Sequence, residues 1–299
     1  MIKRKKNFFA SKKTQAILMM SPFLALFILF TVLPVLSSIV LSFFNYDMVN
    51  KLSFIGFDNY LRMFSGDEIF PLVLKNTLLF AIITGPLGFI LAFVLAWFVN
   101  EFSPKVRTLL SFMFYTPSLV GNAFYIWEVA FSNDSYGYIN SALLSLGIIT
   151  DPILWLKDSR FIFTIIVIVQ LWQSMGISFL ANISGLQNID EGLYEAGSID
   201  GIRSRWQELW YITLPTMKNM LVFSAVMAVQ SSFSAGTISQ ALAGYPSVDY
   251  SADMLVQYMS DVGTVKYEMG YASSIAVILF VMMIVARSVF IKVLDKTGK

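Results

Sequence analysis

The 299-residue chain contains no cysteine and no histidine. The lack of cysteine excludes disulfide bonds and thiol nucleophiles, and the lack of both excludes Cys/His zinc sites and imidazole acid–base chemistry. Charged residues are also scarce, at 13%, whereas hydrophobic residues make up 57% of the chain. This balance is far from that of a soluble domain. We therefore expect an integral membrane protein in which most enzyme mechanisms have no residues to carry them.

Long intervals without charge predict the membrane spans. A helix needs about 20 mostly apolar residues to cross the hydrocarbon layer. Six intervals meet this requirement: 14–46, 76–100, 108–127, 161–189, 219–248 and 269–286. A shorter and more polar stretch, 135–150, is expected to form an interfacial or extracellular helix. The sequence thus predicts an all-α polytopic membrane protein with six transmembrane helices over residues 16–295, between a basic tail at 1–15 and a short tail at 296–299.

Basic residues predict the orientation of these spans. With the amino terminus in the cytoplasm, 15 lysines and arginines lie on the cytoplasmic side and six on the outside. The cytoplasmic set includes Lys3, Arg4, Lys5 and Lys6 at the start and Lys299 at the end. The positive-inside rule therefore places both termini in the cytoplasm. The basic tail is interpreted as a topology anchor at the anionic inner leaflet of the bilayer, not as a nucleic-acid site.

A polar segment, residues 186–215, separates the fourth and fifth spans and is predicted to lie in the cytoplasm. Asp190 is a candidate N-cap for a short helix with Leu193 and Ala196 on one face. Gly201 interrupts this pattern. A second amphipathic helix is predicted from residues at i, i+3, i+4 and i+7 and is expected to end at Pro215; these residues are Trp206, Leu209, Trp210 and Thr213. We name residues 186–215 the hook.

The hook resembles the EAA motif of permease subunits of binding-protein-dependent ABC importers. The resemblance rests on Glu195-Ala196-Gly197, Asp200-Gly201 and Ile212-Thr213-Leu214-Pro215. Two departures are Gly197 in place of alanine and ten residues between Gly201 and Ile212 in place of nine. The resemblance implies a cytoplasmic coupling helix that docks on a separate ATPase subunit, with Glu195 as polar anchor, Gly201 as turn and Pro215 as stop. The implied coupling residues are Glu195, Ala196, Gly197, Asp200, Gly201, Leu214 and Pro215.

The resemblance extends over about residues 21–295 and is to the carbohydrate branch of this family. It is carried by residues 54–60 with Asn76-Thr77, by Pro117 and Trp127, by residues 137–140 with Trp155, and by Trp172 with residues 185–187. The chain is similar to the first permease of the maltose-type importer, without its extra helices and large outer domain.

Uncharged polar residues inside the spans are candidates for a substrate path. Such side chains need partners in hydrocarbon and tend to face the bundle or a water-filled cavity. Amides and hydroxyls match sugar hydroxyls because both groups donate and accept hydrogen bonds. For any one residue, hydrogen bonding between helices is at least as good an explanation. The candidates are Asn122, Gln170, Ser174, Gln230, Ser231 and Ser232; Tyr125, Gln173, Ser234, Thr237, Ser239 and Gln240 lie in the same stretches.

The source of energy is expected outside this chain. No predicted span carries a charged residue in its interior, and the sequence has no Gly-x-x-x-x-Gly-Lys-Ser/Thr loop for nucleotide phosphates. The resemblance implies an inner-membrane subunit of a bacterial carbohydrate importer that binds no cofactor or metal itself. Its implied partners are a second homologous permease, two ATP-binding subunits that hold Mg-ATP, an extracytoplasmic sugar-binding protein and the sugar.

Two other classes of protein remain as alternatives. A stand-alone secondary carrier or channel for a small polar solute would transport alone and would be expected to contain inverted repeats. An intramembrane enzyme acting on lipid-linked sugars would need a carboxylate or histidine facing the centre of the bilayer. The sequence shows no convincing repeat and neither kind of residue inside a span.

Overall fold

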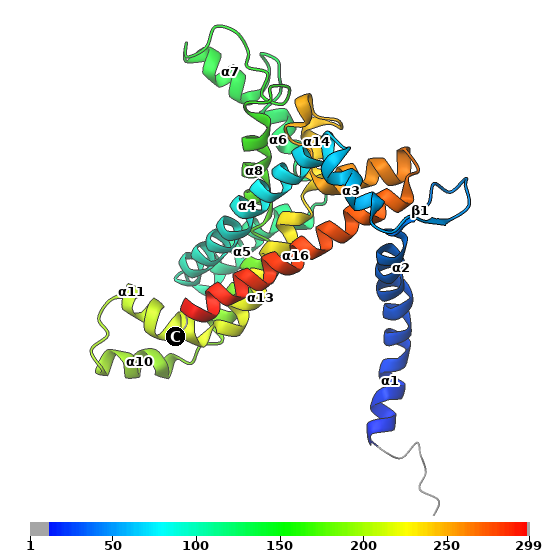
Figure 1. The fold of residues 1–299 in the computed structure, drawn as a ribbon. Helices are drawn as coiled ribbons and strands as arrows, with labels where there is room; N and C mark the ends of the chain where they lie inside the picture. Colours follow the sequence, from blue (N-terminus) through cyan, green and yellow to red (C-terminus); the bar gives the residue numbers. More distant parts are fainter. Residues whose placement is uncertain (1–11, 298–299) are drawn as a thin grey trace, which may run out of the picture. The chain divides into compact units, whose positions relative to one another are not determined.

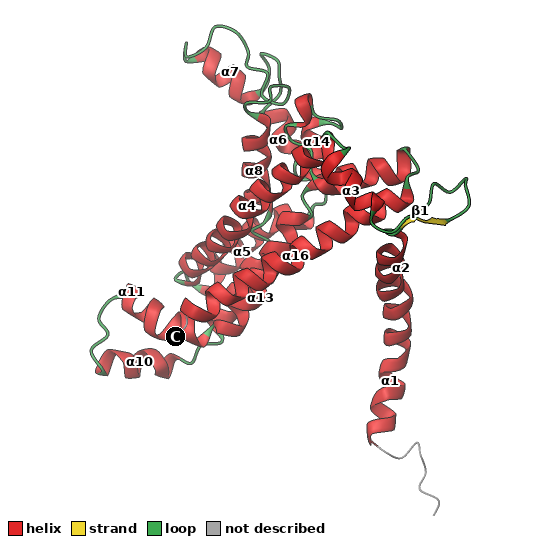
Figure 2. Cartoon of the chain, in the orientation of Figure 1, coloured by secondary structure: helices red, strands yellow, loops and turns green. Residues whose placement is uncertain are grey.

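The computed structural model describes residues 12–297, and they are mostly helical (Figures 1 and 2). Their contacts divide them into two units, residues 12–62 with 261–277 and residues 63–260 with 278–297. Sheet structure in the described part of the chain is limited to one two-stranded pair. The prediction of an all-α polytopic membrane protein is confirmed. Of the predicted tails, residues 1–11, with Lys3 to Lys6, and residues 298–299 lie outside the described residues.

The first unit begins with one long apolar helix. α1 (Lys12–Phe27) continues through a π-helical turn, η2 (Ile28–Val32), into α2 (Leu33–Leu41). The strands β1 (Phe44–Asn45) and β2 (Ser53–Phe54) follow and pair antiparallel, with Phe44 opposite Phe54. The first span therefore ends at Leu41 and not at the predicted residue 46, because Phe44 and Asn45 belong to a strand. The unit also contains most of α3 (Asp58–Ser65), η5 (Asp261–Val265) and the start of α16 (Met269–Thr297).

The π-helical turn η2 lies directly ahead of Pro34, which occupies the first turn of α2. Proline has no N–H to donate, and its ring clashes with the carbonyl four residues earlier in an α-helix. A π turn inserts one extra residue and relieves such a conflict without ending the helix. The first span is therefore continuous despite its proline.

The second unit is built around α4 (Ile69–Asn100), a helix of 32 residues. One face of α4 carries small residues, Gly85, Gly88, Ala92 and Ala96, of which the two alanines are fully buried. Two later helices, α9 (Ile177–Gln187) and α13 (Lys218–Phe233), make the most extensive contacts with α4 and with each other. Small residues allow this close approach of three membrane helices, as is usual in bilayers.

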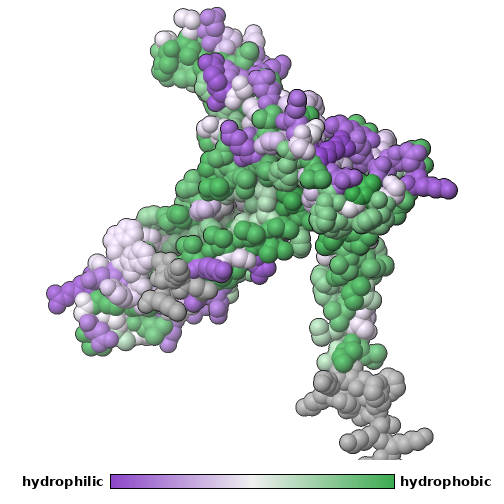
Figure 3. Space-filling view, in the orientation of Figure 1, coloured by the Kyte–Doolittle hydropathy of each residue, from purple (hydrophilic) through white to green (hydrophobic). Residues whose placement is uncertain are grey.

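The remaining elements of the second unit connect and extend these three helices. They are α5 (Pro104–Leu119), α6 (Tyr125–Ala130), α7 (Tyr138–Ser145), α8 (Ile162–Gln173), α10 (Glu191–Ile199), α11 (Arg205–Glu208), η3 (Leu209–Thr213), α12 (Leu214–Thr216), α14 (Gly236–Ala243), η4 (Val248–Tyr250) and α15 (Leu255–Ser260). α7 lies at one end of the unit, and α10 and α11 lie at the opposite end (Figure 1). Hydrophilic residues gather at these two ends, and hydrophobic surface lies between them (Figure 3).

Five helical segments in the described residues are long and apolar enough to cross a membrane. They are Gln15–Leu41, Ile69–Asn100, Ile162–Gln187, Lys218–Ala243 and Met269–Leu294. The predicted third span, 108–127, is instead divided between α5, which has 16 residues, and α6. Val120 adopts an extended backbone conformation that ends α5. The predicted number of six spans is therefore not confirmed by these helices, although each of the other five predicted intervals overlaps one of them.

The stretch predicted to form a non-spanning helix, 135–150, contains the short helix α7. Its residue Asn140 is fully buried and holds the surrounding loop together. Its amide nitrogen donates to the carbonyls of Ser132, Asp134 and Ile153, and its amide oxygen accepts from the Trp155 indole at 2.8 Å. These hydrogen bonds fix α7 and the loops around it at the end of the unit opposite the hook.

Candidate functional site

The first arm of the hook, α10, begins and ends as its sequence predicts. Asp190 caps α10 by accepting a hydrogen bond from the Gly192 N–H at 3.1 Å, as expected. Gly201 has φ +95° and ends the arm. The N–H of Gly201 donates to the carbonyl of Ser198, and the N–H of Ile202 donates to that of Gly197 at 2.9 Å. This pair of bonds is a Schellman motif, which needs a residue in the left-handed region and so favours glycine.

The second arm starts with a capping box that the sequence reasoning missed. The Ser204 hydroxyl accepts from the N–H of Gln207, and the Gln207 side chain accepts from the N–H of Ser204. The signal was present as Ser-x-x-Gln ahead of an apolar stretch. The reciprocal bonds fix the direction of α11 directly after the turn at Gly201.

Beyond α11 the helix passes through Pro215 and ends one residue later, at Thr216, close to the predicted stop; Met217 separates it from α13. η3 is a second π-helical turn, and it is followed by α12 with Pro215 in its first turn and then by α13. The arrangement repeats that of η2 and Pro34. Because a π turn accommodates one extra residue, it also explains how the hook holds ten residues between Gly201 and Ile212.

The π turn also changes which side chains of the second arm are buried. The α-helical spacing predicted a buried face containing Trp206, Leu209, Trp210 and Thr213. In the structure Leu209 and Thr213 are buried with Ile212, whereas both tryptophans are more than half exposed. Leu209 joins a buried apolar cluster with Ala92 and Ala96 of α4 and with residues of α9 and α13. The second arm is therefore seated on the three central helices.

Several specific contacts hold the two arms together and to α4. The hydroxyls of Tyr194 and Thr213 lie 3.0 Å apart, and a β-carbon placed on Gly197 would lie 2.6 Å from Cδ1 of Ile212. Arg205 pairs with Glu101 at 2.7 Å and with Glu208 at 3.0 Å; its hydrogen bond to Glu208 raises the pKa of its guanidinium. The rings of Trp97 and Trp206 are 5.5 Å apart. The hook is thus joined to the end of α4 by an ion pair and a ring contact.

The outward face of α10 is not covered within the described residues. Leu193 is 44% exposed and Ile199 is 86% exposed, and Ala196 between them is exposed as well. Glu195 and Asp200, two of the predicted coupling residues, have exposed side chains on the same arm, whereas Gly197 is buried against Ile212. Leu193 and Ala196 share a face, as predicted, but that face points away from the rest of the chain. The arm presents an apolar surface with carboxylates beside it.

Three of the apolar segments are interrupted near their polar residues. The breaks lie at residues 120–124, at 174–176 between α8 and α9, and at 234–235 between α13 and α14. Each break is at or within four residues of predicted path residues. Non-helical backbone at membrane depth is stable only where protein or water satisfies its polar groups. At the second break a β-carbon on Gly176 would lie 2.5 Å from the side chain of Ser118, so the break between α8 and α9 packs against the end of α5.

Four of the predicted path residues serve packing between helices in this structure. The Gln170 amide donates to the Ser231 hydroxyl at 2.8 Å, and Gln170 is buried. Ser174 and Ser232 lie against two glycines of α4, with their hydroxyl oxygens 2.9 and 3.6 Å from the β-carbon positions of Gly88 and Gly85. Within the chain, these four residues therefore make contacts between helices, which was the alternative to contact with a sugar.

The other two predicted path residues, Asn122 and Gln230, are exposed. Gln230 begins an exposed polar row on α13 and α14 that continues with Ser234, Thr237 and Gln240. The chain neighbours of each member are buried or half-buried, so the row is the exposed side of this interrupted segment. An uncharged polar row exposed on an apolar span is suited to face a hydrated path or another membrane subunit.

Two hydrogen-bonded serines and an asparagine between α9 and α13 were not singled out from the sequence. Ser178 donates to the carbonyl of Ser224, and the Asn182 amide donates to the Ser224 hydroxyl, each at 3.2 Å. All three residues are buried. They tie together the two helices that carry the hook between them.

Comparison with known proteins identifies the family of the chain. The family model of the "binding-protein-dependent transport system inner membrane component" matches residues 84–297. The probable ABC transporter permease protein YesP of Bacillus subtilis is 32% identical over 267 residues, covering 88% of this chain and 84% of YesP. The lactose transport system permease protein LacF of Rhizobium radiobacter is 33% identical over 213 residues, covering 70% of this chain and 69% of LacF.

A solved structure has the same fold over nearly the whole chain. It is a chain of a bacterial alginate ABC transporter in complex with a periplasmic protein that holds an alginate pentasaccharide. The TM-score is 0.77 at 22% identity, and the match covers 96% of each chain. With the family match over residues 84–297, these relationships show that the chain belongs to the binding-protein-dependent transport system inner membrane components, the non-enzymatic permease subunits of ABC transporters.

Proposed function

We propose that the chain is the membrane-spanning permease subunit of an ATP-driven importer that carries a sugar or oligosaccharide into the cytoplasm. The observation that carries the proposal is the hook: its second arm is seated on the central helices, while the apolar face of its first arm is left open. A surface of this kind, with Leu193, Ala196 and Ile199 exposed beside carboxylates, fits a protein partner better than water.

The partner proposed for this face is an ATP-binding subunit, one of two in the assembly. The chain would bind no cofactor or metal itself, and Mg-ATP would be held by that partner. Glu195 and Asp200 would contribute polar contacts at the edge of the interface, while Gly197 and Gly201 set the shape of the arm. The resemblance of the hook to the EAA motif supports this assignment.

The second arm would transmit displacement of the hook to the transport path. α11, η3, α12 and α13 follow one another with no gap longer than one residue, so movement at Trp206 is carried to the start of α13. Farther along α13 and α14 lies the exposed polar row from Gln230 to Gln240. A rigid-body rocking of this segment is one of the known ways to switch a site between two sides of a membrane.

The substrate class is proposed from the polar row and from the relatives. Amide and hydroxyl groups without net charge suit a neutral polyol such as a sugar. The relatives include transport permeases for lactose and for arabinooligosaccharides. The row would face the sugar together with a second, homologous permease, and an extracytoplasmic binding protein would deliver the sugar to the end of the unit that carries α7.

The proposed location is the bacterial inner membrane with both termini in the cytoplasm. The distribution of basic residues in the sequence favours this orientation. The hook would then lie in the cytoplasm, where ATP is available.

Purification of the tagged chain in mild detergent, followed by mass spectrometry of the proteins that accompany it, tests the proposal. Recovery of an ATP-binding subunit and a second permease is expected, with loss of the ATP-binding subunit when Glu195 and Gly201 are both replaced. A chain that purifies alone and transports a solute by itself in liposomes would instead support the stand-alone carrier.

A further inference from the structure

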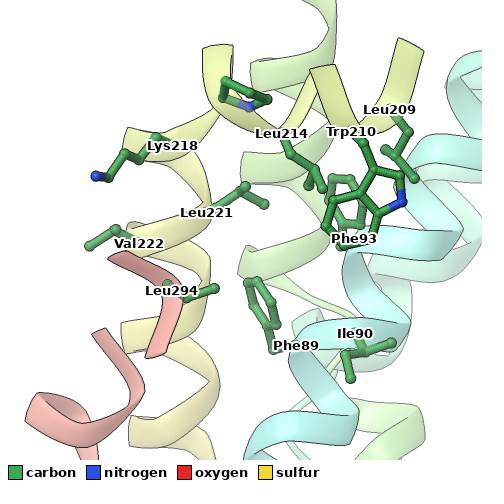
Figure 4. A pocket seen from close by; sticks show the side chains of 11 residues that line it. Phe89, Ile90, Phe93, Leu209, Trp210, Leu214, Lys218, Leu221, Val222 and Leu294 are labelled. Atoms are coloured by element: carbon green, nitrogen blue, oxygen red, sulfur yellow. The ribbon is translucent and has the colours of Figure 1, made fainter. Parts of the chain in front are cut away.

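The second arm of the hook borders two cavities of different character. Trp210 and Leu214 line an apolar cavity of about 480 Å³ (Figure 4). Glu208 and Thr213 line a polar cavity of about 510 Å³. The walls of the polar cavity come from both arms of the hook, from the ends of α4 and α9 and from the start of α5. We name it the root cavity, because it lies where the hook joins the spans.

The charged side chains of the root cavity nearly balance one another. Arg205 pairs with Glu101 at 2.7 Å and with Glu208 at 3.0 Å. The other charged lining residues are Arg107 and Glu191, and neither forms an ion pair with a described residue. One guanidinium and one carboxylate thus remain available to a ligand. They favour a neutral ligand over an ion, because an anion would be repelled by Glu191 and a cation by Arg107.

Two buried polar atoms of residues in the cavity wall make no hydrogen bond within the described part of the chain. They are Oδ1 of Asn100, which is an acceptor, and Nε of Arg107, which is a donor. Another nitrogen of Arg107, Nη2, donates to the carbonyl of Phe102 at 3.2 Å. Buried polar atoms in folded proteins nearly always have a partner. A ligand that completes this wall must therefore supply both a donor and an acceptor.

The size of the cavity and its other lining residues suit a ring that carries hydroxyl groups. The Gln187 amide can both donate and accept hydrogen bonds, and Trp97 adds an aromatic ring to the wall. Aromatic rings pack on the apolar C–H face of a sugar, while polar side chains bind its hydroxyl groups. The volume lies within the range of roughly 300–1,000 Å³ that is usual for small-molecule sites.

We propose that the root cavity binds a small neutral sugar, a mono- or disaccharide. Hydroxyl groups of the sugar would donate to Asn100 and Glu191 and would accept from Arg107. Hydroxyl groups can fill all three roles because each of them is both a donor and an acceptor. The site is distinct from the exposed polar row proposed as the transport path, since Gln230 and the other members of that row do not line the root cavity.

A sugar in the root cavity would hold the hook in place. It would contact both arms of the hook and the ends of the helices on which the hook is seated. Movement of the hook relative to these helices would then require the sugar to leave. This consequence rests on the proposed coupling role of the hook, whereas the sugar site itself does not.

Protection of a cysteine in the cavity wall tests the site. The natural chain has no cysteine, and Gln187→Cys places one at an exposed position that lines the cavity. The full chain, with the subunits that accompany it, is labelled in nanodiscs with an uncharged fluorescent maleimide. The neutral probes are glucose, galactose, arabinose, lactose and maltose, and the anionic probes are gluconate, galacturonate and lactobionate. At least one neutral sugar should slow the labelling several-fold and saturably, and the anions should be several-fold weaker.

Further variants show where the protecting sugar binds. In the Gln187→Cys background, Asn100→Leu and Arg107→Lys should each raise the sugar concentration for half protection several-fold, because each removes one of the two unsatisfied atoms. Gln230→Leu should leave that concentration unchanged, and labelling of Ser145→Cys, at the end of α7, should not respond to sugar. Unchanged melting temperatures would show that the variants are folded.

Three outcomes would overturn the proposal. Absence of protection by every neutral sugar would show that the cavity holds water only. Equal protection by the anions would contradict the selection of a neutral ligand. Protection that is lost in Gln230→Leu but kept in Asn100→Leu and Arg107→Lys would place the sugar in the transport path. Because labelling requires no transport, protection at the root cavity would remain valid even if the chain failed to import sugar.

Discussion

Gly197 and Ile212 fit together because Gly197 lacks a side chain: a β-carbon on Gly197 would lie 2.6 Å from Cδ1 of Ile212. The two residues belong to different arms of the hook, and their contact fixes the distance between the arms. Ile202 also lies close to the same glycine, with its Cδ1 3.2 Å from the β-carbon position. The glycine at this position of the EAA-like motif is thus matched to the large residue that faces it.

The first prediction concerns Gly197→Ala. The added methyl group must displace the end of the Ile212 side chain, which should cost about 1 kcal/mol of stability, at the low end for overpacking a core. The displaced arm should also lower the rate of ATP-dependent uptake. Gly197→Ala combined with Ile212→Val removes the conflicting methyl group and should recover most of both losses. The test is to measure the melting temperature and the uptake rate of the single and double variants in the assembled transporter. Equal losses in both variants would contradict the proposed match between Gly197 and Ile212.

A second prediction concerns the turn at Gly201. Its φ of +95° is unfavourable for residues with a β-carbon, so Gly201→Asp should shift the direction of the second arm. Membrane insertion should be unchanged and transport abolished. Gly147→Asp is a suitable control, because Gly147 has φ +68° with open space around it but lies after α7. Normal uptake by a stably inserted Gly201→Asp variant would exclude the role of this turn in coupling.

The hook also shows what the sequence could and could not predict. The cap at Asp190 and the turn at Gly201 depend on a few neighbouring residues, so they were read correctly. The buried face of the second arm was not predicted correctly. Periodicity at 3.6 residues assumes an α-helix, whereas the π turn before Pro215 shifts the register of the side chains. Widening of the turn before Pro215 lets the helix pass through the proline, and the helix then ends at Thr216.

The membrane class could be predicted because long apolar intervals are a strong signal. The helix breaks at residues 120–124, 174–176 and 234–235 could not be predicted, because hydropathy is averaged over a window and carries no information on backbone geometry. Such breaks depend on tertiary contacts, such as that of Ser118 with Gly176, whose partners lie far apart in sequence. The division of the polar residues into packing and exposed sets depends on the same contacts.

A third prediction separates these two sets of polar residues. Gln170→Leu removes the buried hydrogen bond to Ser231 and should lower stability by about 1 kcal/mol. Gln230→Leu changes an exposed residue of the polar row and should leave stability unchanged. It should reduce sugar uptake about tenfold, which corresponds to the loss of one hydrogen bond of ~1.4 kcal/mol. Thermal unfolding and uptake in reconstituted vesicles measure both. The reverse pattern would show that the row is structural and that Gln170 contacts the sugar.

A fourth prediction uses the pH dependence of stability at Asp253, in the loop after α14. This carboxyl is fully buried and accepts the Ser247 N–H at 3.1 Å. Burial raises its pKa above the ordinary value of 3.8, and the hydrogen bonds from Ser247 only partly oppose this. Because the pKa is higher in the folded state, the ionised carboxyl opposes folding, and this destabilisation develops as pH rises from 3.8 through the raised pKa.

Asp253→Asn cannot ionise and still offers an oxygen to Ser247. Its melting temperature relative to the natural chain should therefore increase as pH is raised from 3.5 to 7, an interval chosen to span the ordinary carboxyl range. Asp151→Asn serves as a control for the loss of one carboxylate from an exposed loop position. A difference between Asp253→Asn and the natural chain that stays constant with pH would show that the carboxyl titrates normally.

The central claim is that the open face of α10 docks on an ATP-binding subunit, and cross-linking from that face tests it most directly. Because the chain has no cysteine, one cysteine introduced at Ala196 can be labelled uniquely with a photoreactive maleimide. Ser145, at the end of α7 and far from the hook, provides the control position (Figure 1). We predict that illumination of native membranes links Ala196→Cys to an ATP-binding protein and that Ser145→Cys gives no such product. Failure of Ala196→Cys to cross-link an ATP-binding protein, while the labelled chain still transports, would contradict the account.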